Sequence, residues 1–102
     1  MTRVRLFVYG SLRRGEQHHG ELVGAAYLGA CITAASYRVV EIAGYPALMP
    51  GTASVTGELY ALPASLVPAL DAFEGHRYRR GPVRMADGTD AEAYFLAEAY
   101  VS

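Results

Sequence analysis

The segment from Val4 to Leu12 (VRLFVYGSL) constrains the fold of this chain more than any other part of the sequence. Its apolar residues alternate with a second set that includes Phe7 and Tyr9, which is the period-two pattern of a β-strand with two partly apolar faces. We therefore expect this strand to lie inside a sheet. The run stops at Gly10-Ser11, so we expect a tight turn whose outward-pointing N–H groups could bind a carboxylate.

Further strand patterns follow along the chain, rich in β-branched and aromatic residues and separated by glycine and proline. Turns are expected at Gly44-Tyr45-Pro46 and Met49-Pro50-Gly51, and Asp87-Gly88 is a typical hairpin dipeptide. A short helical stretch over Gln17–Val23 is a weaker expectation. The predicted strands are Tyr27–Ile32, Ser36–Ile42, Ala47–Met49, Val55–Leu62, Tyr78–Met85 and Ala91–Leu96.

The principal helix is expected after Pro63, with Ser65 as its N-cap and Gly75 at its C-terminal end. Its predicted apolar stripe has the i, i+3, i+4, i+7 spacing and consists of Leu66, Ala69, Leu70 and Phe73. Many short strands with one good helix predict an α+β fold, namely a small, mixed, mostly antiparallel and barrel-like sheet. No stretch resembles a linker, so residues 1–102 are expected to form a single domain.

Composition excludes several classes of function. The net charge is -1, with nine Arg and no Lys spread among ten acidic residues, so no nucleic-acid-binding or membrane-binding surface is expected. Cys31 is the only cysteine and the three histidines have unsuitable spacing, so neither a disulfide nor a metal site is expected. The N-terminal segment has neither a signal-peptide nor a membrane-span pattern, which favours a cytoplasmic location. Unpaired edges of a small sheet allow a monomer or a weak homodimer.

Glu74 is the candidate catalytic residue. A helical wheel places it at the rim of the predicted apolar stripe, where burial would raise the pKa of its carboxyl, and the like charge of Asp71 would raise that pKa further. A carboxyl of this kind can act as a general acid and base. The alternative is an ordinary surface residue in the last turn of a helix.

The turn Tyr9-Gly10-Ser11-Leu12 is the candidate binding segment, and its alternative is an ordinary turn in which Gly10 supplies an unusual backbone angle. The GxxxxG spacing from Gly10 to Gly15 suggests a phosphate loop, but Glu16-Gln17 stand where Lys and Ser or Thr would be needed, so a nucleotide site is rejected. Ser11 as a nucleophile is also disfavoured, because the sequence lacks the G-x-S-x-G elbow and an orienting acid.

The remaining polar residues are expected to have structural roles. His18, His19 and His76 are assigned to exposed loops, and Glu58 is expected to pair with an arginine. Four arginines form a local basic cluster that is typical of a solvated strand face, although one of them could attract an acidic substrate. This cluster consists of Arg77, Arg79, Arg80 and Arg84.

Three segments in this order resemble the γ-glutamylcyclotransferase superfamily and its short, AIG2-like γ-glutamylamine cyclotransferase branch: Phe7–Gly15 (FVYGSLRRG), Gly57–Leu62 (GELYAL) and Leu70–Arg79 (LDAFEGHRYR). The segment Gly44–Leu48 (GYPAL) adds a weaker match. The YGSL turn together with the LDxxEGxxYxR pattern is a specific signal, and the resemblance spans nearly the whole chain.

The resemblance implies a small mixed barrel in which Tyr9, Gly10, Ser11 and Leu12 hold a γ-glutamyl unit and Glu74 is the acid/base. It implies release of 5-oxoproline and a free amine from a small γ-glutamyl substrate, without a cofactor or metal. Two alternatives stay open, a non-catalytic module that binds γ-glutamyl compounds or 5-oxoproline, and acyl transfer on another amino acid. Relatives often carry Asn in the stretch that here contains His18 and His19, so the resemblance does not fix the substrate.

Overall fold

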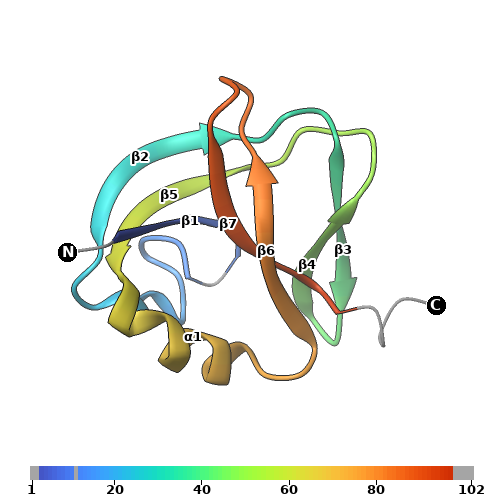
Figure 1. Ribbon diagram of the computed structural model, residues 1–102. Coiled ribbons are helices and arrows are strands. Elements are labelled where there is room, and N and C mark those ends of the chain that lie inside the picture. The colour runs from blue at the N-terminus through green and yellow to red at the C-terminus, as the bar shows by residue number, and fades with distance from the viewer. Residues whose placement is uncertain (1–2, 11, 98–102) are drawn as a thin grey trace.

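The computed structural model describes residues 3–10 and 12–97 and shows a mixed seven-stranded sheet with one α-helix (Figure 1). This arrangement confirms the predicted α+β class, although the sheet does not close into a barrel. Two short 3-10 turns, η1 (His19–Leu22) and η2 (Ala64–Leu66), precede β2 and the helix α1 (Val67–Glu74). The strands are β1 (Arg3–Val8), β2 (Ala26–Ile32), β3 (Tyr37–Ile42), β4 (Tyr45–Pro50), β5 (Thr56–Pro63), β6 (Tyr78–Arg84) and β7 (Asp90–Leu96).

Strand β7 organises the sheet, whose order is β2-β5-β1-β7-β4-β3 with β6 also paired to β7. Strand β6 pairs antiparallel with β7 along its whole length, so β1 and β4 must share the opposite edge of β7. Both pair with it in parallel, β1 near Glu92 and β4 near Phe95. The end of β1 therefore lies close to the start of β4, although the two strands are far apart in the sequence.

Strand β1 lies in the interior of the sheet, between β5 and β7, as its pattern predicts. Its alternating side chains belong to two separate cores. Leu6 and Val8 pack with Val67 and Leu70 of α1. Phe7 packs on the other face with a cluster that includes Leu48. A sheet with both faces covered is fixed in register, because a slip of one residue would exchange the two apolar sets.

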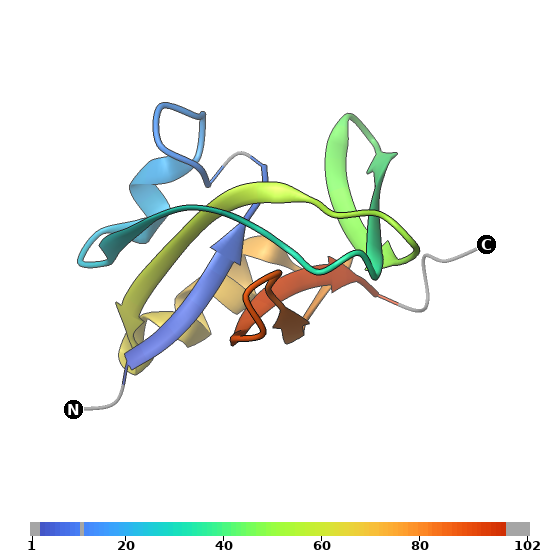
Figure 2. The ribbon, with the colours of Figure 1, turned by 90° about the horizontal axis from the view of Figure 1, so that it is seen from above.

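Figure 2 shows where the other elements lie around this sheet. The loop after β1 and the β3–β4 hairpin rise on the same side, at opposite ends of β5 in that view, and α1 lies behind β1 and β5. The chain ends β1 at Val8 and enters this loop directly.

Helix α1 begins later than predicted. Ser65 lies inside η2 and makes no capping hydrogen bond, so its assignment as the N-cap is wrong. Pro68 lies in the first turn of α1, where a missing N–H costs little. Gly75 ends the helix with a φ of 74° and donates its N–H to the carbonyl of Asp71, which confirms the predicted C-terminal end.

The predicted apolar stripe of this helix is only partly confirmed, because Leu70 is buried and Leu66 packs against the same core but the other two residues do not. The buried residues are Val67 and Leu70, whereas Ala69 is exposed and Phe73 is 39% exposed. Val67, Leu70 and Glu74 follow the i, i+3, i+7 spacing, so they share one face. Glu74 therefore continues the buried stripe itself.

The two turns expected at Gly44-Tyr45-Pro46 and Met49-Pro50-Gly51 have the wrong boundaries. The turn expected at Gly44-Tyr45-Pro46 is a two-residue turn at Ala43 and Gly44, both with positive φ, so Tyr45 and Pro46 already belong to β4. Strand β4 also continues to Pro50, through the start of the second expected turn. The stretch Gln17–Val23 contains only the short 3-10 turn η1, which includes Gly20, a residue that disfavours a longer helix.

The β6–β7 hairpin agrees with the prediction. Gly88 has a φ of 88°, and the carboxyl of Asp87 accepts a hydrogen bond from the backbone N–H of Thr89 at 3.0 Å. Within residues 3–10 and 12–97, none of the helices has the length and apolar character needed to cross a membrane.

Candidate active site

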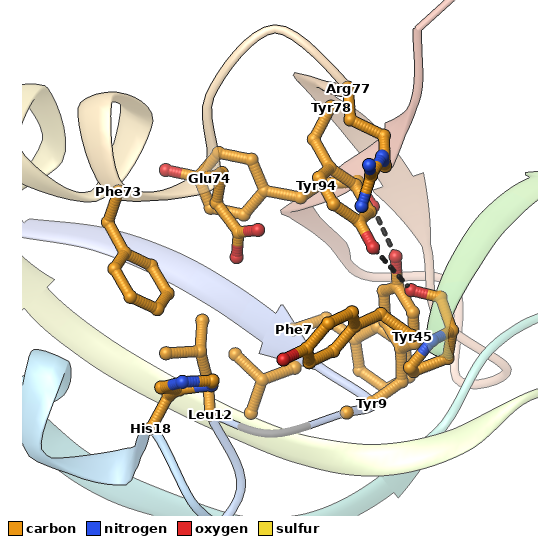
Figure 3. Close-up of a pocket in the computed structure, with 13 residues that line it drawn as sticks. Phe7, Tyr9, Leu12, His18, Tyr45, Phe73, Glu74, Arg77, Tyr78 and Tyr94 are labelled. Carbon is orange, nitrogen blue, oxygen red and sulfur yellow. Dashed lines mark hydrogen bonds between the residues drawn. The ribbon is translucent and has the colours of Figure 1, made fainter. Parts of the chain in front are cut away.

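A cavity of about 260 Å³ opens where the end of β1, the start of β4 and the C-terminal end of α1 meet (Figure 3). Strands β6 and β7 contribute its inner wall. The lining is mainly aromatic and apolar, with a few polar groups that converge on one space, which is typical of a small-molecule site. The lining residues are Phe7, Val8, Tyr9, Gly10, Leu12, His18, Tyr45, Pro46, Phe73, Glu74, Arg77, Tyr78 and Tyr94.

Glu74 is the only carboxylate among the described residues of this lining, and its carboxyl points into the cavity (Figure 3). Burial removes water that would stabilise the anion, which raises the pKa of Glu74 to about 7. Among the described residues, no hydrogen bond or ion pair engages its carboxyl. The group therefore changes protonation near neutral pH and remains accessible to a ligand.

The like charge of Asp71 does not contribute to this pKa, so that part of the sequence reasoning is wrong. Asp71 accepts a hydrogen bond from the guanidinium of Arg80 at 3.0 Å and another from the hydroxyl of Tyr94 at 2.7 Å. Arg80 also pairs with Glu92 on β7. The carboxylate of Asp71 is thus neutralised locally, and the network ties the last turn of α1 to strands β6 and β7.

The candidate binding turn lies on the opposite side of the cavity from α1. Tyr9, Gly10 and Leu12 line the same cavity as Glu74, whereas Ser11 lies outside the described residues. The hydroxyl of Tyr9 donates to the carbonyl of Tyr94 at 2.5 Å and accepts from the backbone N–H of Leu48 at 2.9 Å. The Tyr9 hydroxyl therefore links β7 to β4 in the cavity wall, and burial raises the pKa of this hydroxyl.

Gly10 is needed for close packing rather than for an unusual backbone angle. A Cβ atom at this position would lie 2.8 Å from Cγ of Pro46, and the φ of Gly10 is not positive. The carbonyl of Pro46 accepts a hydrogen bond from the hydroxyl of Tyr78 at 2.9 Å. This bond fixes the start of β4 between the binding turn and β6, so the cavity is built by contacts between remote segments.

The assignment of His18 to an exposed loop is wrong. Its ring lines the cavity and packs edge-on against Phe73, with 5.1 Å between ring centroids, and it faces Tyr45 at 6.3 Å. Phe73 and Tyr45 are about 40% exposed, at 39% and 41%, so the three rings form the rim of the cavity. His76, by contrast, lies in the loop after α1, as predicted, and is exposed.

The basic cluster divides into separate roles. Arg80 and Arg84 form ion pairs with Glu92 and Asp90 of the neighbouring strand β7, and Arg79 is exposed. Arg77 lines the cavity, and its buried Nε atom has no hydrogen-bond partner in the described part of the chain. Sequence reasoning noted that one arginine of the cluster could attract an acidic substrate, but nothing in the pattern separates Arg77 from its neighbours.

The expected pairing of Glu58 with an arginine side chain is wrong. Its carboxyl accepts the backbone N–H of Arg14 at 2.8 Å and the hydroxyl of Tyr60 at 3.0 Å. Glu58 therefore holds the loop after β1 against β5, which is still a structural role. In the part of the chain that the structure describes, no cluster of three or more His, Cys, Asp or Glu could hold a metal ion.

This arrangement places three chemical features in one cavity. A protonatable carboxyl and the side chain of Arg77 share the lining with the backbone of a tight turn, and aromatic rings form much of the wall. The combination fits a small amino-acid derivative whose amine would exchange a proton with Glu74.

Comparison with known proteins gives consistent matches over most of the chain. The family model described as "Gamma-glutamyl cyclotransferase, AIG2-like" matches residues 6–102. A Vibrio cholerae protein that bears the gamma-glutamylcyclotransferase name is 36% identical over 97 residues, which are 93% of this chain and 84% of the relative.

Solved structures give the same result at the level of the fold. A crystal structure of a uropathogenic E. coli-specific protein has a TM-score of 0.90 and 26% identity, and the match covers 97% of this chain and 83% of that chain. A crystal structure of an AIG2-like protein from Mus musculus has a TM-score of 0.81 and 25% identity, with 99% of this chain and 81% of that chain covered.

Proposed function

Because this chain belongs to the AIG2-like gamma-glutamyl cyclotransferase family, we propose that it converts a γ-glutamyl amine or γ-glutamyl amino acid into 5-oxoproline and a free amine. In this proposal Glu74 is the general acid and base, and Tyr9, Gly10, Ser11 and Leu12 hold the γ-glutamyl unit. The observation that carries the proposal is the half-buried Glu74 carboxyl, which points into the same cavity that Tyr9, Gly10 and Leu12 line.

The reaction begins when the Glu74 carboxylate takes a proton from the α-ammonium group of the substrate. The free amine then attacks its own γ-carbonyl carbon, which forms the ring C–N bond and a tetrahedral oxyanion. Glu74 returns its proton to the departing nitrogen and takes the surplus proton from the ring nitrogen. The bond between the γ-carbon and the departing nitrogen breaks, and the released amine receives that last proton, so Glu74 is regenerated.

The pKa of Glu74 suits the first step. An unperturbed Glu near 4.3 would accept a proton from an α-ammonium of about 7.8 at a cost of about 5 kcal/mol. With the pKa of Glu74 at about 7, the transfer costs only about 1 kcal/mol. The same carboxyl remains ionised in enough molecules at neutral pH to act as the base.

The protein would supply mainly position, because nucleophile and electrophile belong to one molecule. A cavity of about 260 Å³ with aromatic walls can hold the γ-glutamyl unit in a folded conformer, and such near-attack geometry is worth several kcal/mol. Backbone N–H groups in the turn at residues 9–12 are proposed to hold the α-carboxylate or the developing oxyanion. No cofactor enters these steps.

The test is production of 5-oxoproline by the purified protein from γ-glutamyl-lysine, γ-glutamyl-alanine and glutathione. Wild type is expected to turn over at least one of them, and Glu74→Gln to lose roughly 100-fold or more of kcat, since proton transfer by a positioned group contributes about 10²–10⁴. Glu16→Gln, an exposed loop carboxyl, is the matched control and should keep full activity.

Two results would contradict the proposal. Equal activity of Glu74→Gln and wild type would show that Glu74 is not the acid/base. Thermal stabilisation of wild type by 5-oxoproline without turnover of any substrate would favour a non-catalytic binding module, because a ligand selective for the folded state raises its stability.

A further inference from the structure

Arg77 is the only arginine among the described residues that line the cavity, and the proposed chemistry does not use it. It lies in the loop between α1 and β6, and its backbone carbonyl accepts the N–H of Ala97 at 2.8 Å. Its Nε atom is buried and has no hydrogen-bond partner among residues 3–10 and 12–97. A buried donor of this kind is rare in native proteins, because burial removes water without supplying a replacement.

Arg77 and Glu74 carry opposite charges in one cavity, yet they do not form an ion pair with each other or with any other described residue. Two arginines of β6, Arg80 and Arg84, form ion pairs with carboxylates. The Arg77 charge is close enough to the hydroxyl of Tyr78 to lower the pKa of that group against the effect of burial. Arg77 is therefore available to a ligand that carries negative charge.

The position of Arg77 indicates which part of a ligand it would meet. In Figure 3 its guanidinium lies beside Tyr78 and Tyr94, whereas Leu12 and His18 lie on the far side of the Glu74 carboxyl. In the proposed reaction the γ-glutamyl unit is held by the turn that contains Leu12, with its amine at Glu74. A departing amine that extends away from Leu12, towards Tyr78 and Tyr94, would then meet Arg77.

We infer that Arg77 binds a carboxylate on the departing amine, so that the protein prefers γ-glutamyl-α-amino acids to γ-glutamyl amides whose leaving group is neutral. This inference rests on the proposed function. An α-amino acid places its carboxylate one carbon from the nitrogen that departs, and a guanidinium can bind both carboxylate oxygens. Arg77 is thus a specificity-determining residue, and it takes no part in the proton transfers.

The experiment compares kcat/KM for γ-glutamyl-L-alanine and γ-glutamyl-L-alaninamide, which differ only in the charge of the leaving group. The two amines differ in intrinsic reactivity, so the informative quantity is the change in their ratio between wild type and Arg77→Gln. We expect this variant to lose about 10- to 100-fold on the carboxylate substrate and less than about 3-fold on the amide, as expected for a charge-assisted hydrogen bond. Arg77→Lys should recover part of the loss.

Two controls separate this role from a structural one. Arg79→Gln removes an exposed arginine two residues away and should leave both substrates unchanged. Stabilisation of the fold by 5-oxoproline, which lacks the leaving group, should be the same in wild type and Arg77→Gln.

An equal loss on both substrates, or a lost response to 5-oxoproline, would overturn the inference while leaving the proposed function intact. Failure of wild type to form 5-oxoproline from either substrate would refute the proposed function and this inference with it.

Discussion

Replacement of Glu74 by glutamine should stabilise the protein at alkaline pH and lose that advantage as the pH falls. Burial raises the pKa of Glu74 from 4.5 in the unfolded chain to about 7 in the folded one. The folded state therefore binds the proton more tightly than the unfolded state does. The stability that this proton contributes is fully present below about pH 4.5 and is lost as the pH rises to about 7.

The magnitude follows from the difference between the two pKa values. One pKa unit corresponds to about 1.4 kcal/mol, so the change between the two limits is about 3 kcal/mol at most. The side chain is only half-buried, and solvent screening reduces this to about 2 kcal/mol. For a chain of 102 residues, that corresponds to a Tm difference of roughly 8 to 16 °C.

The assay is urea or thermal unfolding of wild type and Glu74→Gln at pH 5, 6, 7 and 8. Glutamine has nearly the same shape and does not titrate, so the difference between the two proteins isolates the ionisation of Glu74. The variant should gain about 1.5 kcal/mol on wild type between pH 5 and pH 8, because part of the effect is already lost at pH 5. Glu16→Gln, in an exposed loop, should show a constant difference. A constant difference for Glu74→Gln as well would refute the burial argument.

Three further substitutions test the packing around the cavity. Tyr9→Phe leaves the N–H of Leu48 without its acceptor and should cost about 1–3 kcal/mol in urea unfolding. The Gly57→Ala protein should be mostly unfolded at 37 °C, as measured by circular dichroism, because the Cβ atom of the alanine would lie 2.3 Å from the carbonyl oxygen of Val8. Asp71→Asn removes the ion pair that ties α1 to β6, and it should weaken stabilisation by 5-oxoproline in a thermal-shift assay more than it lowers the Tm of the free protein.

Local patterns in the sequence predict most of the strands because they depend on neighbouring residues. The alternation of side chains in β1 predicts a strand, and the Asp87-Gly88 dipeptide predicts a tight turn. The structure confirms both local predictions. The two parallel pairings of β7 leave no local trace, since each joins residues more than 40 positions apart. The proximity of β1 and β4, and so the cavity between them, could not be predicted from patterns alone.

The buried face of α1 shows a second limit of sequence reasoning. Two sets of residues on this helix satisfy the same spacing, one that contains Phe73 and one that contains Val67, Leu70 and Glu74. Hydrophobicity favours the first set, because it contains only apolar residues. Packing against β1 and β5 selects the second and places a carboxyl on the inward face. The family resemblance pointed to Glu74, whereas the wheel underestimated its burial.

The burial of Glu74 on this face of α1 links the stability of the protein to the proposed chemistry of this residue. The free energy that makes the ionised carboxyl unfavourable in the folded state is the same free energy that raises its affinity for a proton. An apolar residue on that face would satisfy the packing and remove the cost at neutral pH. The stability of the fold therefore does not explain a carboxyl in this position, whereas the proposed proton exchange with a bound amine does. A Glu74→Gln protein that is more stable at pH 8 and inactive would show both consequences of one burial.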